Sequence, residues 1–375
     1  MFQSWSMSHK PSVLFISLTT FQGMGGIEKF NKAFLKALSE LKGDVLSDVT
    51  GISLYDTTVD ERYFPEASYY AGAGKRISAI LKSLRWAANA DIIILGHVNL
   101  ALVGSAIKAL YPKKKIWLTA HGIDVWERQT GLKKQVLHIA DRILAVSDFT
   151  KTKMAQANRL EKTKISIFHN CIDPFFEYPD NFEKPKYLQE RYKVDQHKVL
   201  YTLTRLNSGE KYKGYDKVIE ALPILRKDFP GIKYIIGGKG DEQELARVKQ
   251  LIGENGVEEN VILAGFIPDE EVTDHYKLAD AFVMPSKGEG FGIVFIEAAA
   301  SGANVIAGNK DGSTDALANG ELGTLVDPED VNALAIAIRR NLIQHNHSGD
   351  IQQKTKELFA YKRFAERLRE NIITA

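Results

Sequence analysis

Short apolar runs alternate with amphipathic stretches along most of this chain. The runs Ser12–Ser17, Asp91–Leu95, Lys115–Thr119 and Ile143–Val146 have the length and apolar density of buried strands. Amphipathic stretches separate them, and the first, about Ile27–Leu41, predicts a helix. Strands and helices in alternation predict an α/β fold with a doubly wound parallel sheet.

The alternation breaks once and then starts again. Residues Asp173–Lys186, DPFFEYPDNFEKPK, contain three prolines among mixed polar residues and predict a linker. Beyond it, strands are predicted again at Lys198–Thr204 and Lys233–Ile236. We therefore expect two α/β domains, residues 1–178 and 179–355, whose strand ends are available to form one cleft.

The stretch Ala281–Gly302, AFVMPSKGEGFGIVFIEAAASG, predicts a strand, a glycine-rich loop and a helix. Such a loop presents unpaired N–H groups and the positive end of a helix dipole, which suits a phosphate. Two carboxylates, Glu289 and Glu297, flank that anion site. Acids beside a phosphate are best explained as acceptors for neutral hydroxyl groups, so the pattern indicates a nucleotide sugar.

Simpler explanations exist for the same residues. Glycines serve turn geometry, and a single Glu near a helix start is commonly a solvated acid. A dinucleotide loop is disfavoured, because Gly288-Glu-Gly290-Phe-Gly292 does not have the G-x-G-x-x-G spacing and no acid closes the strand Asn304–Ala307.

Other candidate residues also follow predicted strands. Gly25-Gly26 would let backbone approach a ligand closely, although a tight turn explains them as well. His121 follows Lys115–Thr119, at the strand end where open α/β sheets bind ligands, although a lone His is more often structural. Arg205 and Lys213 could hold a diphosphate, although exposed cations are common in loops.

Composition is that of an ordinary globular chain. The 375 residues are 44% hydrophobic and 26% charged, and their number suggests two or three domains. One cysteine, Cys171, excludes a disulfide framework. Neither a membrane-spanning run nor a signal peptide in MFQSWSMSHK is evident, so we expect a cytoplasmic protein.

Charge is unevenly distributed, although the net charge is only +2. Residues 1–180 contain 23 basic and 17 acidic residues, whereas residues 181–375 contain 26 and 30. The basic half could face an anionic membrane, and the helix predicted over Ala73–Trp86 has apolar residues flanked by Lys and Arg. A core-facing helix with solvated lysines explains that stretch equally well. We expect no nucleic-acid partner.

Taken together, His121, Arg205-x₇-Lys213 and the E-G-F-G-x₄-E stretch from Glu289 to Glu297 resemble the retaining glycosyltransferases of family 4. The similarity covers nearly the whole chain. It implies the GT-B fold, in which two Rossmann-like domains face a central cleft. The N-terminal domain would bind acceptor, the C-terminal domain would bind donor, and residues 356–375, in a helix near Lys354–Ile373, would return to the N-terminal domain. Lys213 stands further from Arg205 than in many members, so Lys211 competes for its role, although Lys213-Gly214 fits the local pattern better.

The resemblance also implies roles. Glu289 would accept hydroxyl groups of the transferred hexose and Glu297 those of the ribose, while Arg205 and Lys213 would stabilise the departing diphosphate. His121 would support the sugar and its developing positive charge. The implied catalytic residues are His121, Arg205, Lys213 and Glu289. The implied donor-binding residues are Gly25, Gly26, Arg205, Lys213, Gly238, Ile267 (reading the base through its backbone), Glu289, Gly290, Phe291, Gly292, Ile293 and Glu297.

No metal and no other cofactor is expected, because the two cations would do the work that a divalent metal does in other transferases. Asp56-x₃-Asp60 has the wrong spacing for a D-x-D metal motif. Retention would proceed by front-face attack, in which the leaving phosphate oxygen takes the acceptor proton. A double displacement through Glu289 is the alternative, disfavoured by its expected hydroxyl contacts.

The substrates are the least determined part. The polar Ser208–Tyr212 insertion is similar to the exopolysaccharide branch of the family. UDP-glucose is favoured as donor over GDP-mannose, and the acceptor would be an oligosaccharide or a polyprenyl diphosphate-linked sugar at the inner membrane face. A nucleotide-sugar epimerase and a non-catalytic nucleotide-sugar-binding protein remain alternatives.

Overall fold

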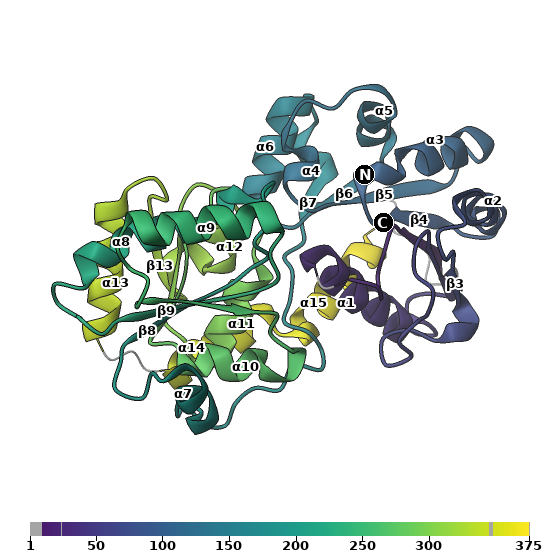
Figure 1. The fold of residues 1–375 in the computed structure, drawn as a ribbon. Coiled ribbons are helices and arrows are strands. Elements are labelled where there is room, and N and C mark those ends of the chain that lie inside the picture. The colour runs from purple at the N-terminus through teal and green to yellow at the C-terminus, as the bar shows by residue number, and fades with distance from the viewer. Residues whose placement is uncertain (1–9, 24, 345–347, 375) are drawn as a thin grey trace. The chain divides into compact units, whose positions relative to one another are not determined.

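The computed structural model describes residues 10–23, 25–344 and 348–374. Its contacts divide the chain into two compact units (Figure 1). Unit 1 runs to Pro174 and resumes at Ala360, and unit 2 is Phe175–Phe359. The observed boundaries follow residues 174 and 359, compared with 178 and 355 as placed from sequence.

Unit 1 contains a seven-stranded parallel sheet in the order β3-β2-β1-β4-β5-β6-β7. Its strands are β1 (Ser12–Ser17), β2 (Asp48–Ser53), β3 (Tyr69–Ala71), β4 (Ile92–Leu95), β5 (Lys115–Ala120), β6 (Arg142–Ala145) and β7 (Ile165–Ile167). Its helices are α1 (Gly26–Leu41), α2 (Arg76–Ala87), α3 (Ala101–Leu110), α4 (Ile123–Trp126), α5 (Gly131–Ile139), α6 (Asp148–Asn158) and α15 (Tyr361–Ile373), with short 3₁₀ turns at Glu66–Ser68, Val98–Leu100 and Lys162–Lys164.

Successive residues of β1 pack on opposite faces of this sheet, as the pleat requires. Leu14 and Ile16 belong to an apolar core shared with α2, α3 and α5. On the other face, phenylalanine rings from β1, α1 and α15 pack together, and the rings of Phe168 and Phe364 lie 4.7 Å apart. Figure 1 shows α15 beside α1, so the end of the chain completes the core of unit 1.

Unit 2 contains a six-stranded parallel sheet in the order β10-β9-β8-β11-β12-β13. Its strands are β8 (Val199–Leu203), β9 (Lys233–Gly237), β10 (Val261–Gly265), β11 (Ala281–Met284), β12 (Val305–Gly308) and β13 (Thr324–Val326). Its helices are α7 (Lys186–Tyr192), α8 (Tyr215–Leu225), α9 (Glu242–Glu254), α10 (Asp269–Leu278), α11 (Ile293–Ala300), α12 (Ser313–Ala316), α13 (Val331–Ile343) and α14 (Ser348–Phe359), with 3₁₀ turns at Lys211–Lys213 and Ala318–Gly320.

The strand orders confirm the predicted α/β fold with two doubly wound sheets. In each sheet the first strand is central, and the next two strands are added on one side of it. The chain then returns to the first strand and adds the remaining strands on its other side. That reversal lies between β1 and β4 in unit 1 and between β8 and β11 in unit 2. Open α/β sheets bind ligands at the carboxyl ends of the strands beside such a reversal.

Two predicted helices have different bounds. The helix predicted from Ala73 begins at Arg76, because Ala73 and Gly74 have φ of 49° and 76°, which an α-helix cannot contain. The helix predicted near Lys354–Ile373 is two helices, α14 and α15. They are separated by Ala360, whose φ of −60° and ψ of 148° are extended. The break coincides with the boundary between the units.

No helix formed by the described residues is both long enough and apolar enough to cross a membrane.

Candidate functional site

Two loops of unit 2 pack against each other where its strand order reverses. One follows β8 and ends at Gly214, and the other follows β11 and ends at Gly292. The backbone N–H of Lys287 donates to the carbonyl of Tyr212 at 3.0 Å. Gly214 has a φ of 79°, and a Cβ there would lie 2.2 Å from the carbonyl oxygen of Pro285. Glycine is therefore required for this close approach.

Lys213 and Glu289, one from each loop, form an ion pair between Nζ and Oε1. Both side chains are 14% exposed. Burial opposes the charge of Lys213, but the neighbouring Glu289 carboxylate together with Tyr212 and Glu210 outweighs it, so the pKa of Lys213 lies above its usual value. Lys211 is exposed and has no ion pair with Glu289 in this structure. Of the two candidate lysines, Lys213 is therefore the one beside Glu289.

Arg205 lies at the same edge of the sheet, but its side chain contacts a different carboxylate, that of Glu210. Its side chain is 68% exposed, and its Nη2 donates to Oε1 of Glu210 at 2.6 Å. The two cations predicted for the diphosphate therefore each have a carboxylate partner from the loops themselves.

The loop after β11 leads into α11 as predicted. Gly292 has a φ of 91°, and α11 begins at Ile293, so the N–H groups at its first turn have no partner within the helix. Phe291 is buried, and its ring packs 5.5 Å from that of Phe359. Because Gly290 has no side chain and the Phe291 ring is buried, a ligand at the helix start would meet mainly backbone here.

Glu297 lies inside α11 and is only 2% exposed. The hydroxyl of Tyr276 is 3.4 Å from its Oε2. Glu289 and Glu297 are thus in different environments, one in a loop beside a lysine and the other against a buried tyrosine. A ribose could contact Glu297 only by reaching the buried edge of the helix.

Gly238 and Ile267 follow β9 and β10. Gly238 has a φ of 133°, and a Cβ there would lie 1.7 Å from the carbonyl oxygen of Thr204, so no other residue fits without moving the loop after β8. Ile267 is buried, and a Cβ added at Gly237 would come within 2.8 Å of it. Both residues therefore shape the loops beside β8.

Asp311, in the loop after β12, is a residue that sequence reasoning missed. It is fully buried, and its Oδ2 accepts a hydrogen bond from the backbone N–H of Glu289 at 2.7 Å. The available signal was an acid between two glycines, Gly308 and Gly312, in a loop that follows a strand. Sequence spacing alone does not show which neighbouring loop it bonds.

His121 lies at the carboxyl end of β5 in unit 1, as predicted. Its Nε2 is 2.9 Å from the carbonyl oxygen of Gly96 and 3.0 Å from Oγ1 of Thr119. Burial, and then the neighbouring ring of His97, lowers the pKa of His121 to about 3. The ring is therefore neutral at physiological pH, and Nε2 carries the proton that the Gly96 carbonyl accepts.

His97 and Asp124 complete this cluster. The rings of His97 and His121 are stacked with centroids 6.1 Å apart, and His97 Nε2 is 3.8 Å from Asp124 Oδ2. Burial lowers the pKa of His97 to about 4 and raises that of Asp124 to about 7, although the N–H groups of His121 and Gly122 oppose the second shift. The nearest ring nitrogen to the Asp124 carboxylate is therefore that of His97, whereas the His121 ring hydrogen-bonds Gly96 and Thr119.

Gly25 caps α1 and Gly26 is its first residue, beside the reversal of strand order in unit 1. Gly25 precedes the helix, and a Cβ there would lie 2.4 Å from Oε2 of Glu28. Oε1 of Glu28 accepts from the hydroxyl of Thr19 at 2.7 Å. Glycine at position 25 therefore leaves room for a carboxylate that ties the loop after β1 to the helix.

Asp56 and Asp60 have separate structural roles. The Asp56 carboxylate accepts from the backbone N–H groups of Thr20 and Gln22 at 2.9 and 3.0 Å and from the Tyr69 hydroxyl at 2.7 Å. Asp60 instead pairs with Arg62. Across the described ranges, no group of three or more His, Cys, Asp or Glu side chains is arranged to hold a metal ion.

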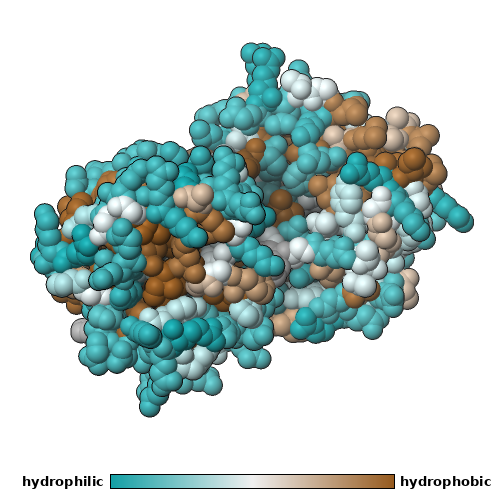
Figure 2. Space-filling view, viewed as in Figure 1, coloured by the Kyte–Doolittle hydropathy of each residue, from teal (hydrophilic) through white to brown (hydrophobic). Residues whose placement is uncertain are grey.

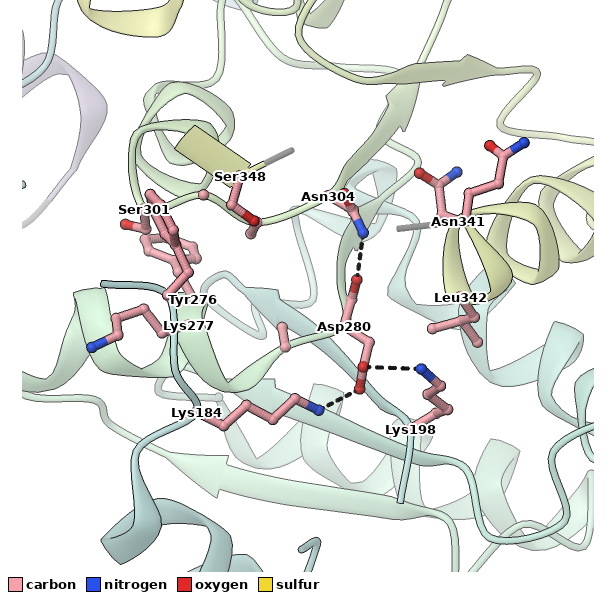
Figure 3. A pocket seen from close by; sticks show the side chains of 15 residues that line it. Lys184, Lys198, Tyr276, Lys277, Asp280, Ser301, Asn304, Asn341, Leu342 and Ser348 are labelled. Carbon is pink, nitrogen blue, oxygen red and sulfur yellow. Dashed lines mark hydrogen bonds and ion pairs between the residues drawn. The ribbon is translucent and has the colours of Figure 1, made fainter. Parts of the chain in front are cut away.

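A cavity of about 280 Å³ lies at the opposite edge of the unit 2 sheet (Figure 3). Asp280, which precedes β11, accepts from Lys184 at 2.6 Å and from Lys198 at 3.4 Å within it. Tyr276 and Asn304 also line it. None of the predicted donor-binding residues lines this cavity, although Tyr276, which contacts Glu297, does.

Two family models match consecutive parts of the chain. Residues 24–175 match Glycosyltransferase Family 4, and residues 184–358 match Glycosyl transferases group 1. A GDP-mannose-dependent alpha-(1-6)-phosphatidylinositol monomannoside mannosyltransferase of Mycolicibacterium smegmatis is 32% identical over 60% of this chain and 60% of its own length. Mannosylfructose-phosphate synthase of Agrobacterium fabrum is 26% identical over 65% of this chain and 57% of its own. The similarity thus spans about three fifths of each relative.

Solved structures match over more of the chain but at lower identity. HepE of Anabaena, solved with UDP and glucose, has a TM-score of 0.79 at 18% identity, covering 97% of this chain and 100% of HepE. Sucrose-phosphate synthase of Thermosynechococcus elongatus has a TM-score of 0.75 at 19% identity, covering 96% and 98%. At these identities the likeness establishes the fold.

Proposed function

Because this chain belongs to glycosyltransferase family 4 and has the GT-B fold, we propose that it is a retaining hexosyltransferase that uses a nucleotide sugar. The observation that carries the proposal is the Lys213–Glu289 pair beside the first turn of α11. A diphosphate requires a cation and N–H donors, and a hexose requires hydroxyl acceptors. The two loops supply these groups at one edge of one sheet.

The proposed roles follow from these surroundings. Lys213 and Arg205 exchange their carboxylate partners for the departing diphosphate, whose negative charge they stabilise. Glu289 is then released to accept hydroxyl groups of the hexose. The acceptor attacks from the face that the diphosphate leaves, and a phosphate oxygen takes its proton, so the anomeric configuration is retained.

His121 acts through hydrogen bonding in this proposal. Its lowered pKa keeps the ring neutral, so it adds no positive charge near a sugar that itself becomes positive. With the proton on Nε2, the other ring nitrogen, Nδ1, is an acceptor. An acceptor suits a hydroxyl group of the donor sugar or of the attacking substrate.

Two donors are considered. UDP-glucose remains the favoured one, and a structurally similar protein, HepE, was solved with UDP and glucose. GDP-mannose is the second candidate, because the mycobacterial relative is named as GDP-mannose-dependent. The base of the nucleotide would contact the backbone of Ile267, which gives no side-chain preference for uracil or guanine.

Metal independence is part of the proposal. Arg205 and Lys213 together supply two positive charges for the diphosphate, which is the role that a divalent ion fills in other transferases. Activity in the presence of EDTA is therefore expected.

We place the reaction in exopolysaccharide assembly, at the inner face of the cell membrane, with an oligosaccharide or polyprenyl diphosphate-linked acceptor. The support for the membrane location is a mixed apolar and basic surface on α2. Ile77 and Leu81 are 77% and 62% exposed, and Lys82 and Arg85 belong to the same helix. Figure 2 shows hydrophobic side chains on the surface where Figure 1 places α2 and α3. Such a surface suits the interface of an anionic bilayer.

The donor experiment uses thermal stability and hydrolysis together. The wild-type protein is heated with UDP-glucose, UDP-GlcNAc, UDP-galactose or GDP-mannose in EDTA, and release of nucleoside diphosphate is measured without and with candidate acceptors. A ligand at a hundred times its Kd adds about 2.7 kcal/mol to the free energy of unfolding. Glu297→Gln tests the ribose contact, and Glu258→Gln changes an exposed acid of the same unit as the control.

One nucleotide sugar should stabilise the wild type and Glu258→Gln but not Glu297→Gln. A product that appears without acceptor and keeps its diphosphate would favour an epimerase. Binding without turnover under any acceptor would favour a non-catalytic binding protein. Absence of a shift with all four nucleotide sugars would contradict the donor site.

A further inference from the structure

The loop between β12 and α12 holds the backbone of Glu289 from two sides. Oδ2 of Asp311 accepts from the N–H of Glu289 at 2.7 Å, and the N–H of Gly312 donates to the carbonyl of Glu289 at 2.8 Å. The backbone N–H and the backbone carbonyl of Glu289 are therefore both hydrogen-bonded, by the consecutive residues Asp311 and Gly312.

The packing leaves this arrangement little freedom. A Cβ on Gly312 would lie 2.1 Å from the carbonyl oxygen of Gly290, so the two loops are in backbone contact. The second oxygen of Asp311, Oδ1, accepts from the N–H of Ser313 at 2.9 Å. Both carboxylate oxygens are thus used, and Asp311 itself is fully buried.

We propose that Asp311 is a positioning residue that fixes the Glu289 backbone, and so places the Glu289 carboxylate and the start of α11 for the donor sugar. This inference rests on the proposed role of Glu289 as the sugar-binding carboxylate. Lys213 fixes the carboxylate of Glu289, because its Nζ pairs with Oε1. Glu289 is therefore held by its backbone from Asp311 and by its carboxylate from Lys213.

The charge state of Asp311 controls this hold. Burial raises the pKa of Asp311 to about 6, while its bonds to Ser313 and to the Glu289 N–H oppose the rise and the Glu289 charge adds to it. The ionised groups that face it are Glu289 and, through Glu289, Lys213. A protonated carboxyl accepts well at only one oxygen, so one of the two N–H groups loses its partner as the pH falls through about 6.

The test compares Asp311→Asn with the wild type. Asparagine has the shape of aspartate, but its NH₂ group must face one of the two N–H donors. The KM for UDP-glucose should rise about tenfold, the size expected for one lost buried hydrogen bond, with a smaller change in kcat. The wild-type KM should rise below about pH 6, and the KM of Asp311→Asn should be raised at every pH from 5 to 8. Asp327→Asn, at an exposed acid paired with Lys310, is the matched control and should behave as wild type.

Hydrogen exchange provides a readout that needs no ligand. The peptide covering residues 285–292 should exchange faster in Asp311→Ala than in Asp327→Ala, because alanine removes both carboxylate acceptors, including the one that the Glu289 N–H uses. Equal exchange in the two variants would overturn the proposal, as would a pH step in KM that persists in Asp311→Asn. If the wild type binds neither UDP-glucose nor GDP-mannose, the proposed function fails, and the exchange experiment still decides the role of Asp311.

Discussion

Nη2 of Arg205 donates to Oε1 of Glu210 at 2.6 Å, across five residues of the loop after β8. The contact gives Arg205 the same kind of partner that Glu289 gives Lys213. Both cations proposed to hold the diphosphate are thus neutralised by carboxylates of the site itself. Donor binding would therefore exchange one set of anions for another, and would not bring charge to bare cations.

Removing the Glu210 charge should strengthen nucleotide binding. In Glu210→Gln, Arg205 no longer has to leave a carboxylate, and an exposed ion pair of this kind is worth about 0–1 kcal/mol. The Kd for UDP, measured by calorimetry, should therefore fall by up to about fivefold. Glu220→Gln, which removes the half-buried partner of Lys217, should leave the Kd unchanged. Weaker binding in Glu210→Gln would mean that Glu210 orients Arg205 instead of competing for it.

Replacing Glu289 should change both the sugar contact and Lys213. The Glu289 charge raises the pKa of Lys213 against burial, so Glu289→Gln should lower that pKa and move the alkaline limb of the pH–rate profile to lower pH. Loss of a charged acceptor should also reduce kcat/KM for donor hydrolysis by roughly ten- to a hundredfold. The control is Glu329→Gln, which removes the exposed partner of Lys287. An unmoved alkaline limb in Glu289→Gln would show that Lys213 does not set it.

Acid should destabilise unit 1 through His121. Its folded pKa of about 3 lies below the unfolded value near 6.5, so the unfolded chain binds more protons between these values and stability is lost as the pH falls from 6.5. By this linkage His121→Gln should recover roughly 2.5 kcal/mol of the acid-induced loss between pH 7.5 and 4.5. The stability of His121→Gln will still decrease somewhat as the pH falls, because His97 has a folded pKa of about 4.

Urea unfolding at the two pH values measures this effect. Three of the four tryptophans, Trp86, Trp117 and Trp126, lie in the described part of unit 1 and none lies in unit 2, so tryptophan fluorescence reports on unit 1. His138→Gln changes an exposed histidine and should retain the wild-type difference. A His121→Gln slope equal to that of the wild type would show that His121 titrates normally.

The α2 surface should bind anionic membranes. Ile77→Ser combined with Leu81→Ser should reduce co-sedimentation with vesicles of phosphatidylcholine and phosphatidylglycerol at least tenfold, because both side chains are exposed and would insert into the interface. Because they are exposed, the melting temperature should change little. Ile336→Ser, at a residue of unit 2 that is 68% exposed, is the control. Equal sedimentation of the double variant and the control would exclude α2 as the contact.

Local patterns were sufficient for the elements and for the edge of the sheet that carries the site. Strand β11, the loop to Gly292 and α11 all lie where the apolar run, the glycines and the Ile, Phe and Ala residues predicted them. Local patterns were insufficient for helix bounds, where the backbone conformation of single residues ends a helix that the composition would continue. Ala73 and Gly74 have helix-compatible neighbours but positive φ, and Ala360 interrupts a stretch whose amphipathic pattern is continuous.

From sequence alone, the chain is an α/β protein with two doubly wound sheets, glycine-rich loops after the strands and the acids and cations of a nucleotide-sugar site. Only the tertiary structure decided which of these groups meet. Lys213 rather than Lys211 pairs with Glu289, Arg205 bonds Glu210, and Asp311 holds the Glu289 backbone. The physical reason is that periodicity and turn residues act over a few positions. Lys213 and Glu289 are 76 residues apart, and Glu289 and Asp311 are 22 residues apart. Their meeting depends on the strand order, which places β11 between β8 and β12.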